Sequence, residues 1–160
     1  MKELDIIKSV YGDSKAQRSG VLLMNHIIEG LEILEKIGAG EDAKKAYCLH
    51  PILQSDEALT NNWNTTDLNG IPIKIIILVM EYRKVANAYL SLRKIKSLKD
   101  IELSPLQEVN QMLYADKIQN RKDFLLYHYR KHARSTQLFI YFNNWIKKLE
   151  SHLKLNPWTS

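Results

Sequence analysis

The chain has 160 residues, of which 45% are hydrophobic and 26% are charged, and its formal net charge at pH 7 is +5. This length and composition predict a single globular domain with a core of its own. With only six glycines and four prolines, the chain has too few turn residues for a loop-rich all-β fold.

The sequence predicts a soluble, cytoplasmic protein. The single cysteine, Cys48, excludes an internal disulfide and fits a reducing compartment, and its apolar surroundings predict a buried thiol. Met1–Gly12 carries charges and no long apolar block, which argues against a signal peptide. The longest apolar run, Ile75–Met80, is far too short to span a bilayer, so no membrane partner is expected.

The positive charge is spread along the chain, with local clusters of basic residues at Arg83–Lys84, Arg93–Lys99 and Arg130–Arg134. Such dispersed basicity fits an anionic partner and equally fits a solvated surface. The sequence contains no DNA- or RNA-binding motif, so a nucleic-acid partner is not expected.

Apolar residues recur at helical spacing through most of the chain. In chain order the expected helices are Lys2–Tyr11, Val21–Ile37, Glu41–Leu59, Ile71–Ile95, Leu106–Lys131 and a last one from Arg134 or Ser135 to Asn156. Residues 1–160 are therefore predicted to form one all-α domain, a bundle of about six helices. Pro51 falls inside the third helix, where a kink or break is expected, and Thr60–Gly70 is expected to be a loop. The first half of Ile71–Ile95 is apolar all round, which predicts a central position.

The segment Ala115–Asn120 lies within the predicted Leu106–Lys131 helix and places polar side chains where that helix enters the core. Asp116 and Asn120 are four residues apart, so they share one face of the helix. A buried carboxylate is costly unless it is paired or binds a metal ion. An ion-paired or capped aspartate and a metal ligand are therefore two open interpretations of Asp116.

Two histidines upstream favour the metal interpretation. His26 lies within the broad apolar surface of the Val21–Ile37 helix, and His50 lies on the apolar face of the next helix. A lone histidine in such a place is more often a hydrogen-bonded core residue than a ligand. Histidines and an aspartate that converge from three separate helices are, in contrast, typical of a metal site.

The order of these residues resembles a known family. Arg18–Gly20 precedes the helix that carries His26; His50 and then Ala115–Asn120 follow. This pattern resembles the HD-domain phosphohydrolase superfamily, and within it the hydrolase domain of alarmone (guanosine tetraphosphate) synthetase/hydrolase proteins and small alarmone hydrolases. In that family a basic residue and Ser-Gly precede the first metal-binding histidine. A His-Asp pair, a Glu-Asp pair one turn later and an Ala-Asp-Lys/Arg-x-x-Asn motif follow. The resemblance covers Gln17–Asp123.

The resemblance implies a role for each matching residue. His26, His50 and Asp116 would be metal ligands, and the usual ion in the family is manganese. The partner would be a phosphorylated purine nucleotide, with Asn120 at its sugar or phosphates and Arg18 near its base. The other nucleotide-binding candidates are Ser19, Lys117 and Arg121. Two imidazoles and a carboxylate suit Mn²⁺ or a similar ion, which can lower the pKa of a bound water and polarise a phosphorus-bound oxygen.

The acidic residues of the family pattern are missing. Pro51 stands where the family has the aspartate of its His-Asp pair, and Gln54-Ser55 stands where it has the catalytic Glu-Asp. A proline side chain ligates nothing, and an amide is not a general acid or base at neutral pH. Manganese binding is therefore expected to be weak or absent. Asp56 and Glu81 are the carboxylates that would have to serve as substitute catalytic residues.

Three functions stay open. The first is a nucleotide-binding HD-fold protein with a degenerate metal centre, which captures or senses a phosphorylated purine nucleotide. The second is an active metal-dependent (pyro)phosphohydrolase of alarmone-like nucleotides. The third is a helical protein-interaction scaffold, and assembly into a homo-oligomer is a further open expectation. The binding function is placed before the hydrolase because the chain lacks acidic residues at two positions that have different roles in the family, one in metal binding and one in catalysis.

Overall fold

The computed structural model describes residues 1–17, 19–88, 95, 97–131 and 133–156, and over these residues the fold is all-α, as predicted. The helices are α1 Lys2–Tyr11, α2 Leu23–Lys36, α3 Glu41–Gln54, α4 Asp56–Trp63, α5 Ile73–Asn87, the short 3₁₀ helix η1 Leu98–Asp100, α6 Gln107–Asp123, the π-helical turn η2 Phe124–His128 and α7 Ser135–Leu153. Together α6 and η2 occupy most of the single helix predicted for Leu106–Lys131. None of the described helices is long and apolar enough to cross a membrane.

The predicted third helix is in fact two helices. α3 continues through Pro51 to Gln54, and the break comes one turn later than predicted, at Ser55. Ser55 adopts an extended backbone, and its hydroxyl accepts a hydrogen bond from the backbone N–H of Ala58 at 2.9 Å, so it caps the next helix. α4 then occupies the start of the predicted Thr60–Gly70 loop. A serine cap followed by acidic residues therefore outweighs the interior proline in choosing where the chain turns.

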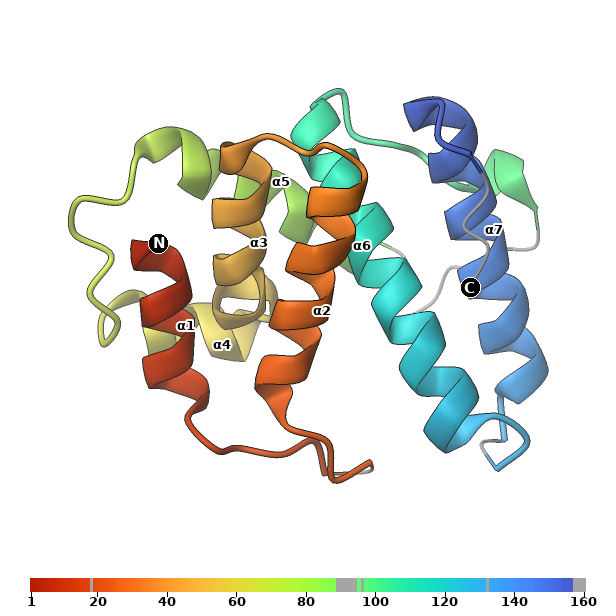
Figure 1. Cartoon of the computed structure of the whole chain (residues 1–160), viewed down its shortest axis with the longest axis horizontal. Helices are drawn as coiled ribbons and strands as arrows, with labels where there is room; N and C mark the ends of the chain where they lie inside the picture. Colours follow the sequence, from red (N-terminus) through yellow and green to blue (C-terminus); the bar gives the residue numbers. More distant parts are fainter. Residues whose placement is uncertain (18, 89–94, 96, 132, 157–160) are drawn as a thin grey trace.

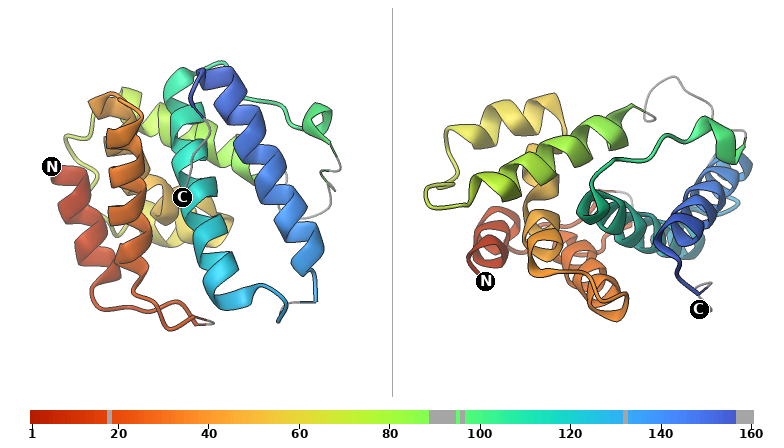
Figure 2. Two further views of the ribbon diagram at one scale, coloured as in Figure 1. Left: turned by 45° about the vertical axis from the view of Figure 1, so that its right-hand side comes forward. Right: turned by 90° about the horizontal axis from the view of Figure 1, so that it is seen from above.

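α3 is the central helix of the bundle. It packs against α1, α2, α4, α5 and α6, and it lies between α5 and α2 when the molecule is seen from above (Figure 2). α6 packs against α2 on one side and against α7 on the other (Figure 1). Helices α2, α3 and α6 all contact one another, so side chains from three distant parts of the sequence meet in the interior.

α5 is less central than predicted. Val79 is fully buried, whereas Ile73 and Ile77 are 74% and 53% exposed and Met80 is 36% exposed. These three residues recur at helical spacing, so they form one stripe on the side of α5 that faces away from its neighbours. The prediction of a central position from apolar residues all around the helix was therefore wrong. α5 buries one side against α3 and α6 and leaves the other side exposed to solvent. Residues 89–94, in which the predicted helix would continue, lie outside the described residues.

The contact between α2 and α3 depends on Gly30. Tyr47 is fully buried, and a Cβ atom at Gly30 would lie only 2.2 Å from the Cε1, Cζ and Oη atoms of its ring. The same ring is 5.8 Å from the imidazole of His26 and 4.6 Å from that of His50, measured between centroids. The space beside His26 that the glycine leaves is therefore filled by a tyrosine, and the positions of both imidazoles depend on it.

Gly30→Ala should destabilise the fold, although alanine favours a helix over glycine by about 1 kcal/mol. The new methyl group would push the buried Tyr47 ring into the imidazoles, and overpacking of this kind costs about 1–3 kcal/mol. Urea unfolding measures the change. Glu32→Ala, at an exposed position of the same helix, is the matched control and should change stability by less than about 0.5 kcal/mol. Wild-type stability in Gly30→Ala would contradict the close contact with Tyr47.

Candidate metal centre

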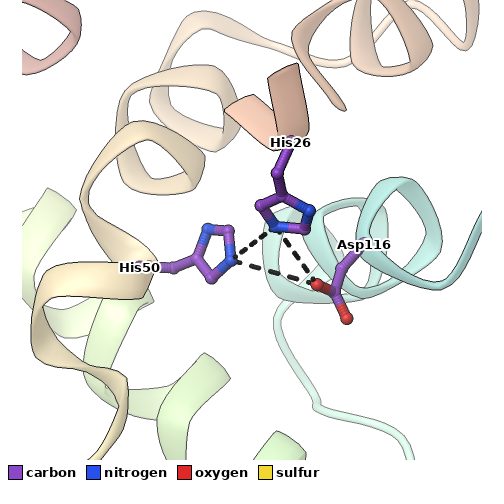
Figure 3. A group of neighbouring side chains, drawn as sticks. All are labelled: His26, His50 and Asp116. Atoms are coloured by element: carbon purple, nitrogen blue, oxygen red, sulfur yellow. Dashed lines mark hydrogen bonds and ion pairs between the residues drawn. The ribbon is translucent and has the colours of Figure 1, made fainter. Parts of the chain in front are cut away.

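Three side chains from three helices meet in the interior, as Figure 3 shows: His26 from α2, His50 from α3 and Asp116 from α6. The Nε2 atom of His26 is 3.3 Å from Nε2 of His50 and 3.5 Å from Oδ1 of Asp116. Nε2 of His50 is 3.9 Å from the same oxygen. His26 is half-buried and the other two are buried. His26, His50 and Asp116, which the order of the sequence motifs predicted to form one site, are thus neighbours in the fold.

A network of carboxylates fixes the orientation of His26. The amide nitrogen of Gln119 donates hydrogen bonds to Asp123 at 2.7 Å and to Glu29 at 3.4 Å. Because carboxylates only accept, the amide oxygen must face the other way, toward Nδ1 of His26 at 2.5 Å. Nδ1 is therefore the protonated nitrogen of the neutral ring, and Nε2 presents its lone pair toward His50 and Asp116.

His50 is oriented in the same sense by a different acceptor. Its Nδ1 atom donates to the backbone carbonyl of Tyr47 at 2.6 Å, so Nε2 of the neutral ring is again an acceptor. Burial lowers the pKa of His50 to about 3, and the positive charge that His26 carries when it is protonated lowers it further in the same direction. The imidazole is consequently neutral near pH 7, and its Nε2 lone pair is free to bind a cation.

The two oxygens of Asp116 have different partners. Oδ2 accepts a hydrogen bond from the ammonium group of the buried Lys117 at 2.7 Å, whereas Oδ1 faces the two histidines and accepts from the amide of Asn120 at 2.7 Å. Burial alone would raise the pKa of this carboxyl group, but Lys117 and then the two histidines lower it to about 2. Burial would likewise lower the pKa of Lys117, and the carboxylate outweighs it, so that pKa is raised. Asp116 is thus ionised and ion-paired, with one oxygen left facing the histidines.

These donor atoms fit a divalent metal ion. Two unprotonated nitrogens and one carboxylate oxygen direct electron-rich atoms at a common point, all within 4.8 Å of one another. Tetrahedral coordination at about 2.1 Å would separate two ligand atoms by about 3.4 Å, close to the observed 3.3, 3.5 and 3.9 Å. Each Nδ1–H is held by an acceptor, as in metal-binding histidines. Such an N/O set suits zinc, manganese or a similar ion.

The three residues border a cavity of about 1170 Å³. Its polar lining includes Ser19, Asn120 and Asp123, together with Arg134, which directly precedes α7. Its apolar lining comes from the segment around the start of α2 and from α7: Val21, Leu22, Leu138, Ile140, Tyr141 and Phe142. The Tyr141 ring lies 5.7 Å from the ammonium group of Lys117, so a ligand beside the metal-ligand candidates would contact both polar and aromatic side chains.

Three of the five predicted nucleotide-binding residues line the cavity. Ser19, Lys117 and Asn120 line the cavity, although the ammonium group of Lys117 is already paired with Asp116. Arg121 is half-buried and is not among the described residues that line it. Arg18 lies outside the described residues.

The two substitute acids are not brought to the cavity. Asp56 begins α4, its side chain is 95% exposed, and it pairs with Arg83. Glu81 on α5 accepts a hydrogen bond from Ser104 at 3.1 Å and pairs with Lys84 at 3.2 Å. Neither borders the cavity. The capped turn at Ser55 directs α4, and with it Asp56, away from the end of α3, while Glu81 is held by Ser104 and Lys84.

The residues that orient the histidines were not among the predicted site residues. Gln119 and Glu29 each follow a ligand candidate by three residues, a spacing that puts neighbours on one helix face, so helical geometry could have found them. Tyr47 precedes His50 by the same spacing. Its contact with Gly30 had no signal in the sequence, because that contact depends on how α2 packs on α3.

Comparisons of the chain with protein-family models, with curated proteins and with solved structures found no match. The resemblance to the HD-domain superfamily therefore rests on the order and spacing of the residues described above.

Metal-free protein should lose stability as the pH falls from about 6.5 toward 3. The unfolded chain binds a proton at His50 near pH 6.5, whereas the folded chain binds it only near pH 3. Between about pH 7.5 and 5.5 this residue should lower the free energy of unfolding by roughly 1 kcal/mol. Urea unfolding with a chelator present measures the loss, and His50→Gln should flatten the pH dependence by that amount. The same slope in His50→Gln would contradict a buried neutral imidazole.

Proposed function

We propose that this protein binds a divalent metal ion through His26, His50 and Asp116 and takes a phosphorylated purine nucleotide into the adjoining cavity. It captures or senses the nucleotide rather than turning it over. The observation that carries the proposal is the convergence of two imidazole Nε2 atoms and one carboxylate oxygen at the edge of a large cavity. When bound, the ion would supply Lewis-acid attraction for a phosphoryl oxygen.

The metal part of the proposal is supported by the hydrogen bonds around the ligands. Gln119 and the Tyr47 carbonyl leave both Nε2 atoms unprotonated. Lys117 and Asn120 keep the carboxylate of Asp116 ionised and oriented. These partners orient the donor atoms before an ion arrives, which lowers the cost of assembling the site. The resemblance to the HD superfamily makes manganese the first ion to test.

The nucleotide part is supported by the size and lining of the cavity. Its volume of about 1170 Å³ is ample beside the roughly 300–1,000 Å³ typical of ligand pockets. Tyr141 and Phe142 offer aromatic surface for a purine base. Ser19 and Arg134, together with the metal centre, offer partners for phosphate oxygens. A nucleotide with its phosphates at the metal centre and its base against the aromatic rings of α7 would use both the polar and the apolar lining.

Binding without turnover is supported by what occupies the catalytic positions. Pro51 and Gln54 both line the cavity, at the two places where the resembling family has its acidic residues. Neither side chain transfers a proton at neutral pH. Asp56 and Glu81 pair with other residues away from the cavity.

A second candidate function is an active metal-dependent phosphohydrolase. One observation favours it: all three metal-ligand candidates border the cavity, so a bound nucleotide would reach the ion, as a three-ligand catalytic site requires.

The wild-type protein should bind Mn²⁺ or Zn²⁺ in calorimetry, and Asp116→Asn should weaken that binding more than about 10-fold, since it removes the charge at the centre of the site. Asp56→Asn is the matched control, because it removes an equal charge from an exposed position outside the cavity. Guanosine and adenosine polyphosphates should then bind the wild type more tightly than Asp116→Asn at the same metal concentration. Equal metal affinity in the wild type and in Asp116→Asn would contradict the ligand set. An absence of heat and of thermal shift with every nucleotide would leave the scaffold hypothesis.

Hydrolysis of pyrophosphate-bearing nucleotides should be absent or very slow even with added Mn²⁺, since loss of one general acid or base costs roughly 10²- to 10⁴-fold. Gln54→Glu restores a carboxyl group at the cavity and should raise the rate of phosphate or pyrophosphate release. Gln137→Glu places a carboxyl group elsewhere on the cavity wall and should not. Rapid turnover by the unmodified protein, abolished by Asp116→Asn, would instead establish the hydrolase function.

A further inference from the structure

We propose that Pro51 is a positioning residue for the metal ligand His50, because its missing N–H group leaves the Tyr47 carbonyl free to hold the imidazole. The inference rests on the proposed metal site for its functional consequence, although the hydrogen bond itself does not depend on a metal ion. It gives a positive role to the residue that stands where the HD family has an aspartate.

The hydrogen-bond pattern of an α-helix leaves one carbonyl group of α3 without its usual donor. Each backbone N–H bonds the carbonyl four residues earlier, so in α3 the N–H of residue 51 would bond the carbonyl of Tyr47. Proline has no N–H, and α3 nevertheless continues through Pro51 to Gln54. The carbonyl of Tyr47 therefore lacks its helical donor, and a buried carbonyl without a donor is unfavourable.

The imidazole of His50 supplies the missing donor. Its Nδ1 atom lies 2.6 Å from the Tyr47 carbonyl oxygen, and His50 is only 1% exposed, so water cannot readily replace that partner. The bond satisfies the carbonyl and places the ring proton on Nδ1. Nε2 is then the unprotonated atom, and it faces His26 and Asp116 at 3.3 and 3.9 Å.

An ordinary residue at position 51 would compete for the same carbonyl. Its N–H would bond the Tyr47 carbonyl oxygen along the helix axis, and this second donor would weaken the bond that the oxygen accepts from His50. The ring proton could then move to Nε2, where it can donate to Oδ1 of Asp116 and would occupy the direction in which a metal ion binds. Partners of this kind typically change metal affinity 10- to 100-fold.

The test compares Pro51→Ala with wild-type protein labelled with ¹⁵N-histidine, by long-range ¹H–¹⁵N NMR of the metal-free form. Wild-type His50 should show a protonated Nδ1 and an unprotonated Nε2, and Pro51→Ala should shift it toward the opposite tautomer. The affinity for Mn²⁺ or Zn²⁺ should fall roughly 10- to 100-fold. The melting temperature should not fall, since alanine restores a helical hydrogen bond. A merely structural role for Pro51 would change neither the tautomer nor the affinity.

Gln119→Leu is the matched control, because it removes the acceptor of the other histidine. It should change the NMR signals of His26 and leave the tautomer of His50 as in the wild type. An unchanged His50 tautomer in Pro51→Ala would overturn the inference, and so would a changed tautomer with undiminished metal affinity. If wild-type protein binds no divalent ion while Pro51→Ala still shifts the tautomer, the proposed metal function fails and the hydrogen-bonding role of Pro51 stands.

Discussion

The site depends on keeping one carboxylate charged inside the protein. Asp116 is 4% exposed, and an unpaired ion at such a depth would cost several kcal/mol. Lys117 and Asn120, from the same helix, compensate that cost at 2.7 Å each. Because both partners lie on α6, much of the stabilisation of this charge comes from one helix. One side of Oδ1 consequently remains available to residues of α2 and α3.

The histidines impose the next constraint, since each ring must hold its proton on the nitrogen that faces away from Asp116. For His26 this requires Gln119, whose amide is itself oriented by Glu29 and Asp123. For His50 it requires only a backbone carbonyl. The polar network therefore runs inward from the edge of the cavity and ends at the buried imidazole of His50. Its hydrogen bonds form together only when α2, α3 and α6 pack in one register.

The sequence predicted those features that periodicity and motif order encode. The helical class and the grouping of His26, His50 and Asp116 are of this kind. It did not predict the break at Ser55, because a helix cap and an interior proline compete within one short segment, and the sequence pattern alone did not rank the cap above the proline. It also misjudged α5, since an apolar pattern shows which residues can be buried and not which side finds a neighbour. Whether Asp56 would reach the cavity depended on that same turn at Ser55.

In the proposed function, the carboxylates of the cavity serve binding rather than proton transfer. Among the described residues that line it, the carboxylates are Asp116 and Asp123. Asp116 is ionised, with a pKa near 2, and Asp123 accepts the hydrogen bond that orients Gln119 and lies 3.8 Å from Lys122. A general acid or base must exchange a proton within hydrogen-bond reach of the reacting group. Protonation of either aspartate would weaken the bonds to its partners, which orient a histidine or compensate a buried charge, and the proposed metal centre depends on both.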